Sequence, residues 1–240
     1  MIIHWLPTID STNSEALRRL RELPSGSVLA AREQTAGRGQ RGNSWFSEPG
    51  TNLTFSVVLK FSPGELAASN AHRLNYLASV SVVDLLGEEG VSAQVKWPND
   101  IYVGRRKICG ILVENTLGAS GVEASVIGVG LNVNQREFPQ LANATSLHLC
   151  TGGQFNLPQM LERYCALMEK RLPSLLEDSL LQTYTALLFQ KGTSSVYQDY
   201  LKQEQFTGVI EGVAPDGRLL VRDPAGQIRR YHFKELGYII

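Results

Sequence analysis

Residues 93–134, AQVKWPNDIYVGRRKICGILVENTLGASGVEASVIGVGLNVN, determine the class of fold. Four apolar segments in this stretch are predicted strands, at 93–96, 101–103, 108–114 and 124–134. The turn Gly104-Arg105-Arg106 favours a hairpin between the second and the third of them. Because no helix separates these strands, we predict an α+β fold: a mixed, largely antiparallel sheet with helices on one side.

The residues before this stretch are predicted to add two helices and two strands. Thr12 precedes Glu15 by three positions, which fits a capping box at the start of the first helix, and Ser25-Gly26 ends that helix. Glu15 is also placed to pair with Arg19 one turn later. The other elements are strands at 28–31 and 52–61 and a helix at 71–89.

After this stretch, the predicted secondary structure changes from helices to short β segments near position 190. Two helices are predicted at 157–172 and 176–191. Pro158 suits the first turn of one helix, and Gly192 suits the C-terminal cap of the other. Short β segments follow at 206–213, 218–222 and 227–233. We therefore predict a large domain at residues 1–191 and a small β-barrel at residues 192–240, which packs against it.

The composition excludes several classes of protein. The 240 residues carry 23 Lys plus Arg and 23 Asp plus Glu, and this zero net charge argues against a mainly electrostatic nucleic-acid binder. No apolar run reaches the length of a membrane span, and the N-terminus, MIIHWLPTIDSTN, lacks the pattern of a secretion signal. Cys109, Cys150 and Cys165 are unclustered, which suits a reducing cytoplasm and argues against disulfides or a zinc site.

A glycine-rich loop follows the predicted strand at 28–31. Gly37-Arg38-Gly39-Gln40-Arg41-Gly42 matches a dinucleotide-binding pattern in letters, but no helix follows it, so a βαβ nucleotide fold is not indicated. The glycines allow a ligand to approach the backbone closely. Arg38 and Arg41 suit a phosphate or a carboxylate, and Trp45 provides an apolar wall. The alternative is a mobile surface loop with two solvated arginines.

Two further motifs lie in the stretch that determines the fold. Lys96-Trp97-Pro98-Asn99-Asp100 ends a strand with polar groups, of which Lys96 suits a phosphate and Asp100 a cation or an arginine. The alternative is a tight turn whose polar side chains bond their own backbone. Lys107 precedes an apolar strand in which Gly110 leaves room for a small acid with an apolar body. The alternative is a lysine that extends along the surface.

Glycines also interrupt the last strand of this stretch. Gly128-Val129-Gly130-Leu131-Asn132 places two glycines in an apolar strand, which weakens the strand unless a ligand or a backbone lies close. The alternative is a β-bulge. At the start of the first helix, Ser11 and Asn13 remain available to a ligand if Thr12 is the cap.

These motifs resemble, in the same order, those of the biotin–protein ligase (biotin–[acetyl-CoA-carboxylase] ligase) family. They are Ser11-Thr12-Asn13, Gln34 with Gly37 to Trp45, Lys96 to Asp100, Lys107 with Gly110-Ile111-Leu112, and Gly128 to Asn132. The resemblance implies a catalytic domain related to class II aminoacyl-tRNA synthetases and a C-terminal SH3-like barrel. It also implies the short form without an N-terminal DNA-binding domain, because the ligase motifs begin at residue 11.

The resemblance implies two half-reactions that use biotin, ATP and Mg²⁺. The biotin carboxylate attacks the α-phosphate of ATP, which gives biotinyl-5′-adenylate and pyrophosphate. A lysine of a biotin carboxyl carrier protein then attacks the adenylate and releases AMP. Because two anions meet in the first step, the site must supply fixed cations and hydrogen-bond donors.

The resemblance also assigns roles to individual residues. Lys107 and Arg38 are the implied catalytic residues, which hold the carboxylate and the phosphate. The implied biotin-binding residues are Ser11, Thr12, Asn13, Gln34, Gly37, Arg38, Gly39, Gln40, Trp45, Lys107, Gly110, Leu112 and Gly128. The implied ATP-binding residues are Arg38, Arg41, Trp45, Lys96, Asn99, Asp100 and Asn132, and Asp100 is also the implied ligand of Mg²⁺.

One residue departs from the family pattern, and two other functions stay open. Some members have an arginine where this chain has Gln40, so its contact either passes to Arg41 or is absent. A lipoate or octanoate protein ligase or transferase shares the architecture, and a non-catalytic sensor keeps only the biotin contacts. We expect a cytoplasmic enzyme that binds neither DNA nor membranes, and the family suggests a homodimer.

Overall fold

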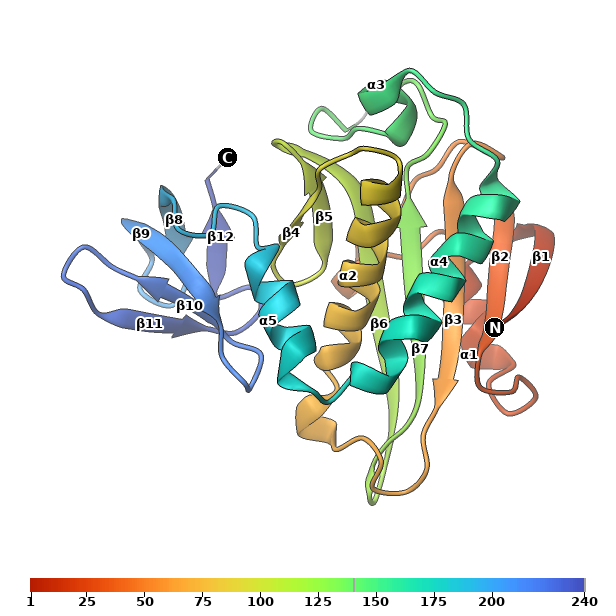
Figure 1. The fold of residues 1–240 in the computed structure, drawn as a ribbon, viewed down its shortest axis with the longest axis horizontal. Helices are drawn as coiled ribbons and strands as arrows, with labels where there is room; N and C mark the ends of the chain where they lie inside the picture. The colour runs from red at the N-terminus through yellow and green to blue at the C-terminus, as the bar shows by residue number, and fades with distance from the viewer. Residues whose placement is uncertain (140, 240) are drawn as a thin grey trace.

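The computed structural model describes residues 1–139 and 141–239, except for the side chain of Arg41. A large sheet forms the centre of the molecule, and a small sheet lies beside it at the C-terminal end (Figure 1). The strands of the large sheet are β1 (Ile2–Ile9), β2 (Ser27–Gln34), β3 (Leu53–Lys60), β4 (Gln94–Lys96), β5 (Asp100–Val103), β6 (Arg106–Gly118) and β7 (Gly121–Leu131).

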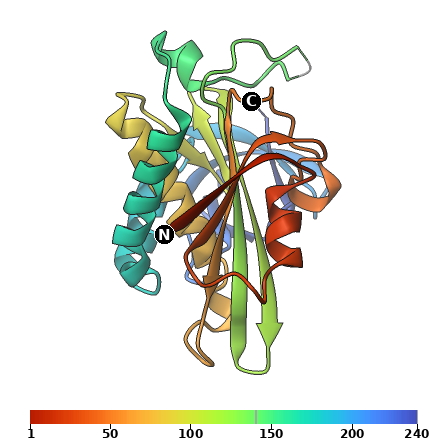
Figure 2. The same ribbon diagram turned by 90° about the vertical axis from the view of Figure 1, so that its right-hand side faces the viewer.

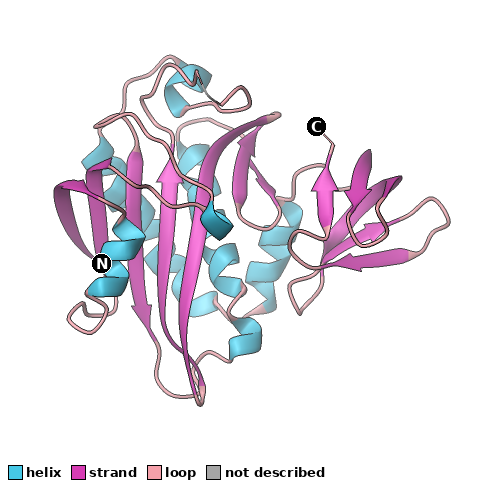
Figure 3. Cartoon of the chain, turned by 180° about the vertical axis from the view of Figure 1, so that it is seen from behind, coloured by secondary structure: helices cyan, strands magenta, loops and turns pink. Residues whose placement is uncertain are grey.

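The large sheet is mixed and largely antiparallel, which confirms the prediction. Its strand order is β1-β2-β3-β7-β6-β5-β4, and only the pair β1–β2 is parallel. The hairpin of β6 and β7 extends past the ends of the neighbouring strands (Figure 3). Within it Gly110 lies opposite Gly130, and Leu112 lies opposite Gly128. Opposite residues of an antiparallel pair point to the same face, so these glycines leave a shallow area on one face of the sheet.

Helices cover both faces of the large sheet. They are α1 (Thr12–Arg18), α2 (Arg73–Glu88), α3 (Leu147–Thr151), α4 (Leu157–Arg171) and α5 (Asp178–Ala186), with 3₁₀ turns η1 (Gln40–Gly42), η2 (Ala68–Asn70) and η3 (Leu172–Ser174). α2 and α4 lie on one face with α5 beside α2, and α1 lies on the other face (Figure 2). The prediction that the helices share one side is therefore wrong for α1, whose buried Ala16 packs with Leu29 and Val58.

The main core lies between the sheet and the layer of α2, α4 and α5. α2 is apolar on most of its surface, and its residues Leu74, Leu77 and Leu85 are fully buried. Phe55 of β3 meets Tyr164 of α4 edge to face, with 4.9 Å between the ring centroids. No helix in the described residues is both long enough and apolar enough to span a lipid bilayer.

The small sheet confirms the predicted C-terminal β unit. Its strands are β8 (Ser194–Asp199), β9 (Glu204–Val213), β10 (Leu219–Arg222), β11 (Ile228–Tyr231) and β12 (Leu236–Tyr238). They are antiparallel in the order β11-β10-β9-β8-β12. The division of the chain into domains at residues 191 and 192 stays a prediction.

The turn between β9 and β10 attaches the small sheet to the large unit. Trp97 Nε1 donates a hydrogen bond to the Gly217 carbonyl oxygen at 3.2 Å. The His72 ring lies against the same residue, since a Cβ added at Gly217 would be 3.0 Å from it. The position of the small sheet is therefore tied to the motif that contains Trp97.

Several predicted boundaries differ from the structure. β1, β8, β12 and α3 were not predicted, because each is short or carries polar residues among its apolar ones. Ser11, not Thr12, caps α1, and the helix ends at Arg18 instead of Ser25-Gly26. The expected pair of Glu15 and Arg19 is present at 3.9 Å. α5 ends at Ala186, so Gly192 is not its cap.

Asp199 is the central polar residue of the small sheet. Its side chain is buried, accepts a hydrogen bond from the Tyr231 hydroxyl at 2.7 Å, and accepts from the Leu201 and Lys202 amides at 2.9 and 3.0 Å. Burial raises the pKa of Asp199, but these hydrogen bonds and the Arg229 charge outweigh it and hold the pKa below the usual value.

We predict that Asp199→Asn lowers the free energy of unfolding by about 2 kcal/mol at neutral pH, because it removes a charged acceptor from buried donors. A carboxylate whose pKa is lowered on folding stabilises the fold above its unfolded pKa, and this stabilisation is lost as the pH falls through the folded pKa. The difference between parent and variant in urea unfolding should therefore shrink below about pH 4. Exposed Glu162→Gln is the control. A difference that does not change with pH would contradict this account of Asp199.

Candidate active site

A cavity of about 710 Å³ opens on the glycine-bearing face of the large sheet. Side chains from β6, β7, the start of α1, the glycine-rich loop (residues 37–45) and the small sheet line it. The predicted site residues among them are Ser11, Thr12, Asn13, Gln34, Arg38, Gly39, Gln40, Trp45, Lys96, Asn99, Asp100, Lys107, Gly110, Leu112 and Gly128. Motifs that are up to 117 positions apart in the sequence therefore meet at one site.

A β-bulge directs Lys107 into this cavity. Ile101 pairs with Cys109 and Tyr102 pairs with Lys107, so Ile108 is an extra residue in β6. The bulge places Lys107 on the same side as Gly110, where a Cβ would lie 3.2 Å from Lys107 Nζ. The segment that precedes α3 holds the backbone of Lys107, since the Lys107 N–H donates to the Asn143 carbonyl oxygen at 2.7 Å.

Lys107 and Asp100 form an ion pair at this end of the cavity. Lys107 Nζ lies 2.6 Å from Asp100 Oδ1, and both side chains are half-buried. Among the described residues that line the cavity, Asp100 is the only acidic one. At this end of the cavity the Lys107 cation is thus balanced by one half-buried carboxylate, and an arriving anion can compete with Asp100 for it.

Lys96 lies beside this pair and between two tyrosine rings. Its Nζ is 5.0 Å from the Tyr102 ring centroid and 5.1 Å from the Tyr238 ring centroid, and it donates to the Tyr102 hydroxyl at 3.3 Å. Burial lowers the pKa of Lys96, and the Asp100 charge opposes this shift. Tyr238 belongs to β12, so the small sheet contributes directly to this end of the cavity.

Trp45 lies on the glycines of β6 and β7. A Cβ added at Gly130 would be 2.3 Å from Cε2 of the Trp45 indole, and one at Gly110 would be 3.2 Å from its Cζ3. Lys107 Nζ is 5.9 Å from the centroid of the same ring. The space that Gly110 was predicted to leave for a ligand is therefore bounded by Trp45 in this structure.

The other end of the cavity is a polar group of side chains around the start of α1. Gln34 Oε1 accepts hydrogen bonds from the Thr12 backbone N–H at 2.8 Å and from the Thr12 hydroxyl at 3.1 Å. Ser56 Oγ lies 2.8 Å from the Thr12 hydroxyl and 2.5 Å from Asn13 Oδ1. In the described part of the chain, the Gln34 side-chain N–H groups have no hydrogen-bond acceptor, which leaves them to a ligand.

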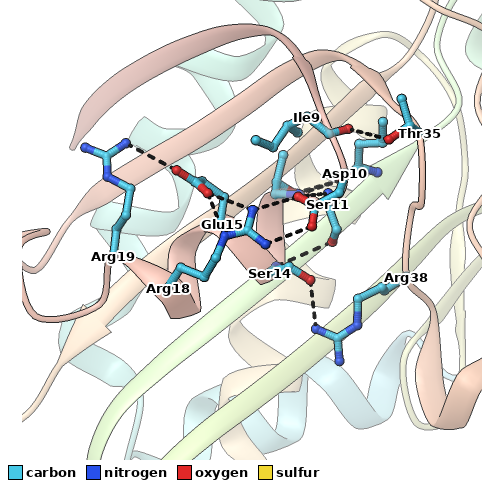
Figure 4. A network of polar contacts seen from close by, with 11 residues as sticks. Ile9, Asp10, Ser11, Ser14, Glu15, Arg18, Arg19, Thr35 and Arg38 are labelled. Carbon is cyan, nitrogen blue, oxygen red and sulfur yellow. Dashed lines mark hydrogen bonds and ion pairs between the residues drawn. The ribbon is translucent and has the colours of Figure 1, made fainter.

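Arg38 lies at this polar end and not beside Lys107. Its guanidinium makes a two-point contact with the Glu114 carboxylate at 2.8 and 3.1 Å, and it points toward Ser14 at 3.4 Å (Figure 4). Glu114 and Lys107 are separated along β6 by roughly 20 Å at about 3.3 Å per residue. The family resemblance implies that Arg38 and Lys107 together hold the biotin carboxylate and the phosphate. In this structure the two positive charges lie at different ends of the cavity.

Two of the predicted residues, Gly37 and Asn132, do not line the cavity. Gly37 lies behind it, where a Cβ would be 2.3 Å from the Trp45 carbonyl oxygen, so glycine permits the loop to fold on itself. Asn132 is buried outside it and donates to the Thr145 carbonyl oxygen at 2.9 Å. The side chain of Arg41 lies outside the described part of the structure. Asn132 thus supports the segment that holds Lys107, and its contact with a nucleotide stays a prediction.

Four residues that contact side chains of the cavity wall were not predicted from the sequence. They are Ser56, Tyr102, Glu114 and Tyr238. None belongs to a motif, and each is a single polar or aromatic residue in a strand. The period-2 pattern that places Glu114 on the face of Gly110 and Leu112 was the one signal available for it.

We predict that Gly130→Ala displaces the Trp45 indole, because the new methyl group would be 2.3 Å from Cε2. The tryptophan emission should shift to longer wavelength as the indole becomes more exposed. The free energy of unfolding, measured in urea, should fall by about 1–3 kcal/mol. The shift should be absent in a Trp45→Phe background. The matched control is Gly87→Ala on α2, whose Cβ meets no atom within 4 Å. Unchanged emission in Gly130→Ala would disprove the contact.

The chain is similar in sequence to several characterised proteins. It is 43% identical over 131 residues to the bifunctional ligase/repressor BirA of Escherichia coli, across 55% of this chain and 40% of that protein. It is 39% identical over 131 residues to the biotin–[acetyl-CoA-carboxylase] ligase of Paracoccus denitrificans, across 53% of each protein. The alignments thus span about half the length of these relatives or less.

The fold is similar to solved structures over nearly its whole length. The biotin protein ligase of Aquifex aeolicus in complex with biotin and ATP superposes with a TM-score of 0.78 at 28% identity, over 98% of this chain and 97% of that one. The model of the biotin/lipoate A/B protein ligase family matches residues 5–132, which is more than half of this chain. The motifs, the fold and the cavity agree with this match, and the chain belongs to the biotin/lipoate A/B protein ligase family.

Proposed function

We propose that the protein activates biotin to biotinyl-5′-adenylate with ATP and transfers the biotinyl group to a lysine of a biotin carboxyl carrier protein. The observation that carries this proposal is the polarity of the cavity. A cation, Lys107, is at one end. At the other end are uncharged hydrogen-bonding side chains together with Arg38, whose charge is paired with Glu114, and glycines lie between the two ends. Biotin has the same order of groups: a carboxylate, an apolar chain and ring, and an uncharged ureido group.

The uncharged end suits the ureido group. The Ser11 hydroxyl and the Gln34 amide supply donors for its oxygen, and Thr12 is held in place by Gln34. Gly128 and Leu112 bound the bicyclic ring, since Gly128 leaves no side chain on the sheet face. A buried urea without these donors would lose its hydrogen bonds to water without replacement, so the donors also favour biotin over an apolar dithiolane.

The cationic end suits the reaction. One carboxylate oxygen of biotin attacks the α-phosphorus of ATP, the bond to the bridging oxygen breaks, and pyrophosphate leaves. Lys107 reduces the repulsion between the two anions, and it is free to do so once it exchanges Asp100 for them. The amine of the carrier lysine then attacks the acyl carbon, and AMP leaves. Positioning and charge stabilisation supply the catalysis, since no side-chain nucleophile is needed.

Lys96 and Trp45 serve the nucleotide in this proposal, with the phosphates at Lys96 and the base against the indole. Asp100 would hold Mg²⁺ together with the ATP phosphates, because Mg²⁺ is commonly bound through one or two carboxylates plus substrate phosphates. When bound, Mg²⁺ would neutralise phosphate charge. The residues present fit this use, although the described residues contain no cluster of three or more metal-ligating side chains.

The partners and the location belong to the proposal as well. The carrier domain is the proposed macromolecular substrate, and a homodimer is the proposed assembly. The proposed location is the cytoplasm, which is supported by three cysteines that form no disulfide. Binding of DNA or of a membrane is not part of the proposed function.

We predict that Lys107→Ala reduces adenylate formation by about 100-fold or more, because it removes the cation from the reacting atoms. The protein should remain folded, since Lys107 is half-buried in the cavity wall. Arg105→Ala is the matched control, as Arg105 is an exposed cation at the tip of the same hairpin. Adenylate formation by Lys107→Ala at the parent rate would remove Lys107 from the mechanism.

The function itself is tested with purified protein, Mg²⁺ and α-labelled ATP in the absence of carrier. Biotin, lipoate and octanoate are supplied in separate reactions, and labelled adenylate and pyrophosphate are measured. The proposal expects adenylate with biotin alone. Adenylate with lipoate or octanoate alone would replace it with the other activity of the family, and biotin binding without any adenylate would indicate a sensor.

A further inference from the structure

We propose that Glu114 is a positioning residue that holds the glycine-rich loop closed over the polar end of the cavity, and that it thereby sets how long biotin stays bound. This inference rests on the proposed function. Glu114 does not line the cavity, so it acts through the residues that it contacts. Its effect is therefore expected on the lifetime of the complex and not on the chemical step.

Glu114 joins three separate segments of the chain. Its Oε1 accepts from Arg38 Nη2 at 2.8 Å, and its Oε2 accepts from Arg38 Nη1 at 3.1 Å. The same Oε2 accepts from Asn13 Nδ2 at 2.9 Å. Arg38 belongs to the glycine-rich loop, Asn13 to α1 and Glu114 to β6. One carboxylate thus connects the loop, the helix and the sheet around the polar end.

Glu114 helps to fix the orientation of the Asn13 side-chain amide. Asn13 Nδ2 donates to Glu114 and, at 3.3 Å, to the Leu112 carbonyl oxygen, while Asn13 Oδ1 lies 2.5 Å from Ser56 Oγ. A Cβ added at Gly128 would be 2.1 Å from Asn13 Oδ1, so this oxygen lies over the glycine floor. Both ends of the Asn13 amide are occupied. Asn13 therefore shapes the pocket and is not a free ligand donor.

In the part of the loop that the structure describes, which leaves out the Arg41 side chain, few other contacts connect the glycine-rich loop to the rest of the chain. Its hydrogen bonds are mainly internal, such as Gly39 N–H to the Asn43 carbonyl oxygen at 2.7 Å and Trp45 N–H to the Gly37 carbonyl oxygen at 2.9 Å. Its contacts with the sheet include Arg38 on Glu114 and Trp45 on Gly110 and Gly130. A movement of the loop away from the sheet must break the contact of Arg38 with Glu114.

The ion pair of Arg38 and Glu114 is partly exposed, which suits a contact that breaks and re-forms as the loop moves. The Arg38 side chain is 42% exposed and that of Glu114 is 25% exposed, so water and salt weaken the pair. Its two-point geometry still makes it stronger than an ordinary surface pair. We therefore expect biotin release from the parent protein to become faster as the salt concentration rises, and this dependence to be much smaller once the pair is removed.

The test compares Glu114→Gln with the parent protein in three measurements. These are amide hydrogen exchange of residues 37–45 without ligand, the rate of biotin release at low and high salt, and the rate of adenylate formation at saturating biotin and ATP. Glu114→Gln keeps the shape of the side chain and removes its charge. We expect loop exchange and biotin release to become about five- to tenfold faster, with the saturated rate unchanged, because the charged, two-point contact is lost.

Two further variants make the result specific. The double variant Arg38→Glu with Glu114→Arg restores an ion pair in the opposite direction and should recover slow loop exchange. Glu123→Gln, an exposed carboxylate on β7, should behave as the parent protein does. Faster exchange in Glu123→Gln as well would mean that loss of any carboxylate on the hairpin of β6 and β7 loosens the loop, which would overturn the assignment.

The outcomes separate this inference from the proposed function. Exchange and release equal to those of the parent would overturn the role of Glu114. A lower saturated rate with unchanged release would also overturn it, because Arg38 would then act at the reacting atoms. If the parent protein bound no biotin, the proposed function would fail. Amide hydrogen exchange would then be the one test of whether Glu114 holds the loop closed. Faster exchange in Glu114→Gln would support that role, and equal exchange would overturn it.

Discussion

The pairing of β6 with β7 is the constraint on which the rest of the site depends. Its register places Gly110 opposite Gly130 and Leu112 opposite Gly128, so three of these four positions on one face of a central hairpin carry no side chain. A sheet face without side chains is unstable unless something covers it. Here Trp45 covers Gly130, and Asn13 covers Gly128. A shift of the register by one residue would turn the glycines toward α2 and remove the cavity.

Two ion pairs divide the cavity into ends with different chemistry. Lys107 with Asp100 lies at one end, and Arg38 with Glu114 lies at the other. The first pair is half-buried inside the cavity wall, where an arriving anion competes directly for Lys107. The second pair includes a carboxylate that does not line the cavity, and it connects a loop to a strand. The two salt bridges thus differ in their carboxylates: Asp100 lines the cavity beside its cation, whereas Glu114 contacts Arg38 without lining the cavity.

The sequence predicted the fold class and the gathering of the motifs, and the reason is local. Glycine, proline and paired polar residues punctuate strands in ways that apolar residues do not, so residues 37–42, 96–100 and 128–132 were recognisable as loops or special strands. The C-terminal β unit was predicted for the same reason, from its turns at Pro215-Asp216-Gly217 and Asp223-Pro224.

The features that the sequence did not reveal depend on tertiary contacts. The bulge at Ile108, which directs Lys107, is visible only once β5 and β6 are paired. Arg38 was assigned from its charge and from the family resemblance, and the carboxylate that binds it is 76 positions away. Ser11 replaced Thr12 as the cap of α1 because Gln34 engages the Thr12 hydroxyl. Each of these differences arises from a partner distant in sequence.

The most direct test of the account is a crystal structure of the protein with biotin bound. The account predicts that the biotin carboxylate lies within hydrogen-bond distance of Lys107 Nζ, and that the ureido group lies among Ser11, Thr12 and Gln34. It also predicts that Arg38 keeps its contact with Glu114. A carboxylate bound at Arg38, with Lys107 still paired to Asp100, would contradict the separation of the two ends on which the account is built.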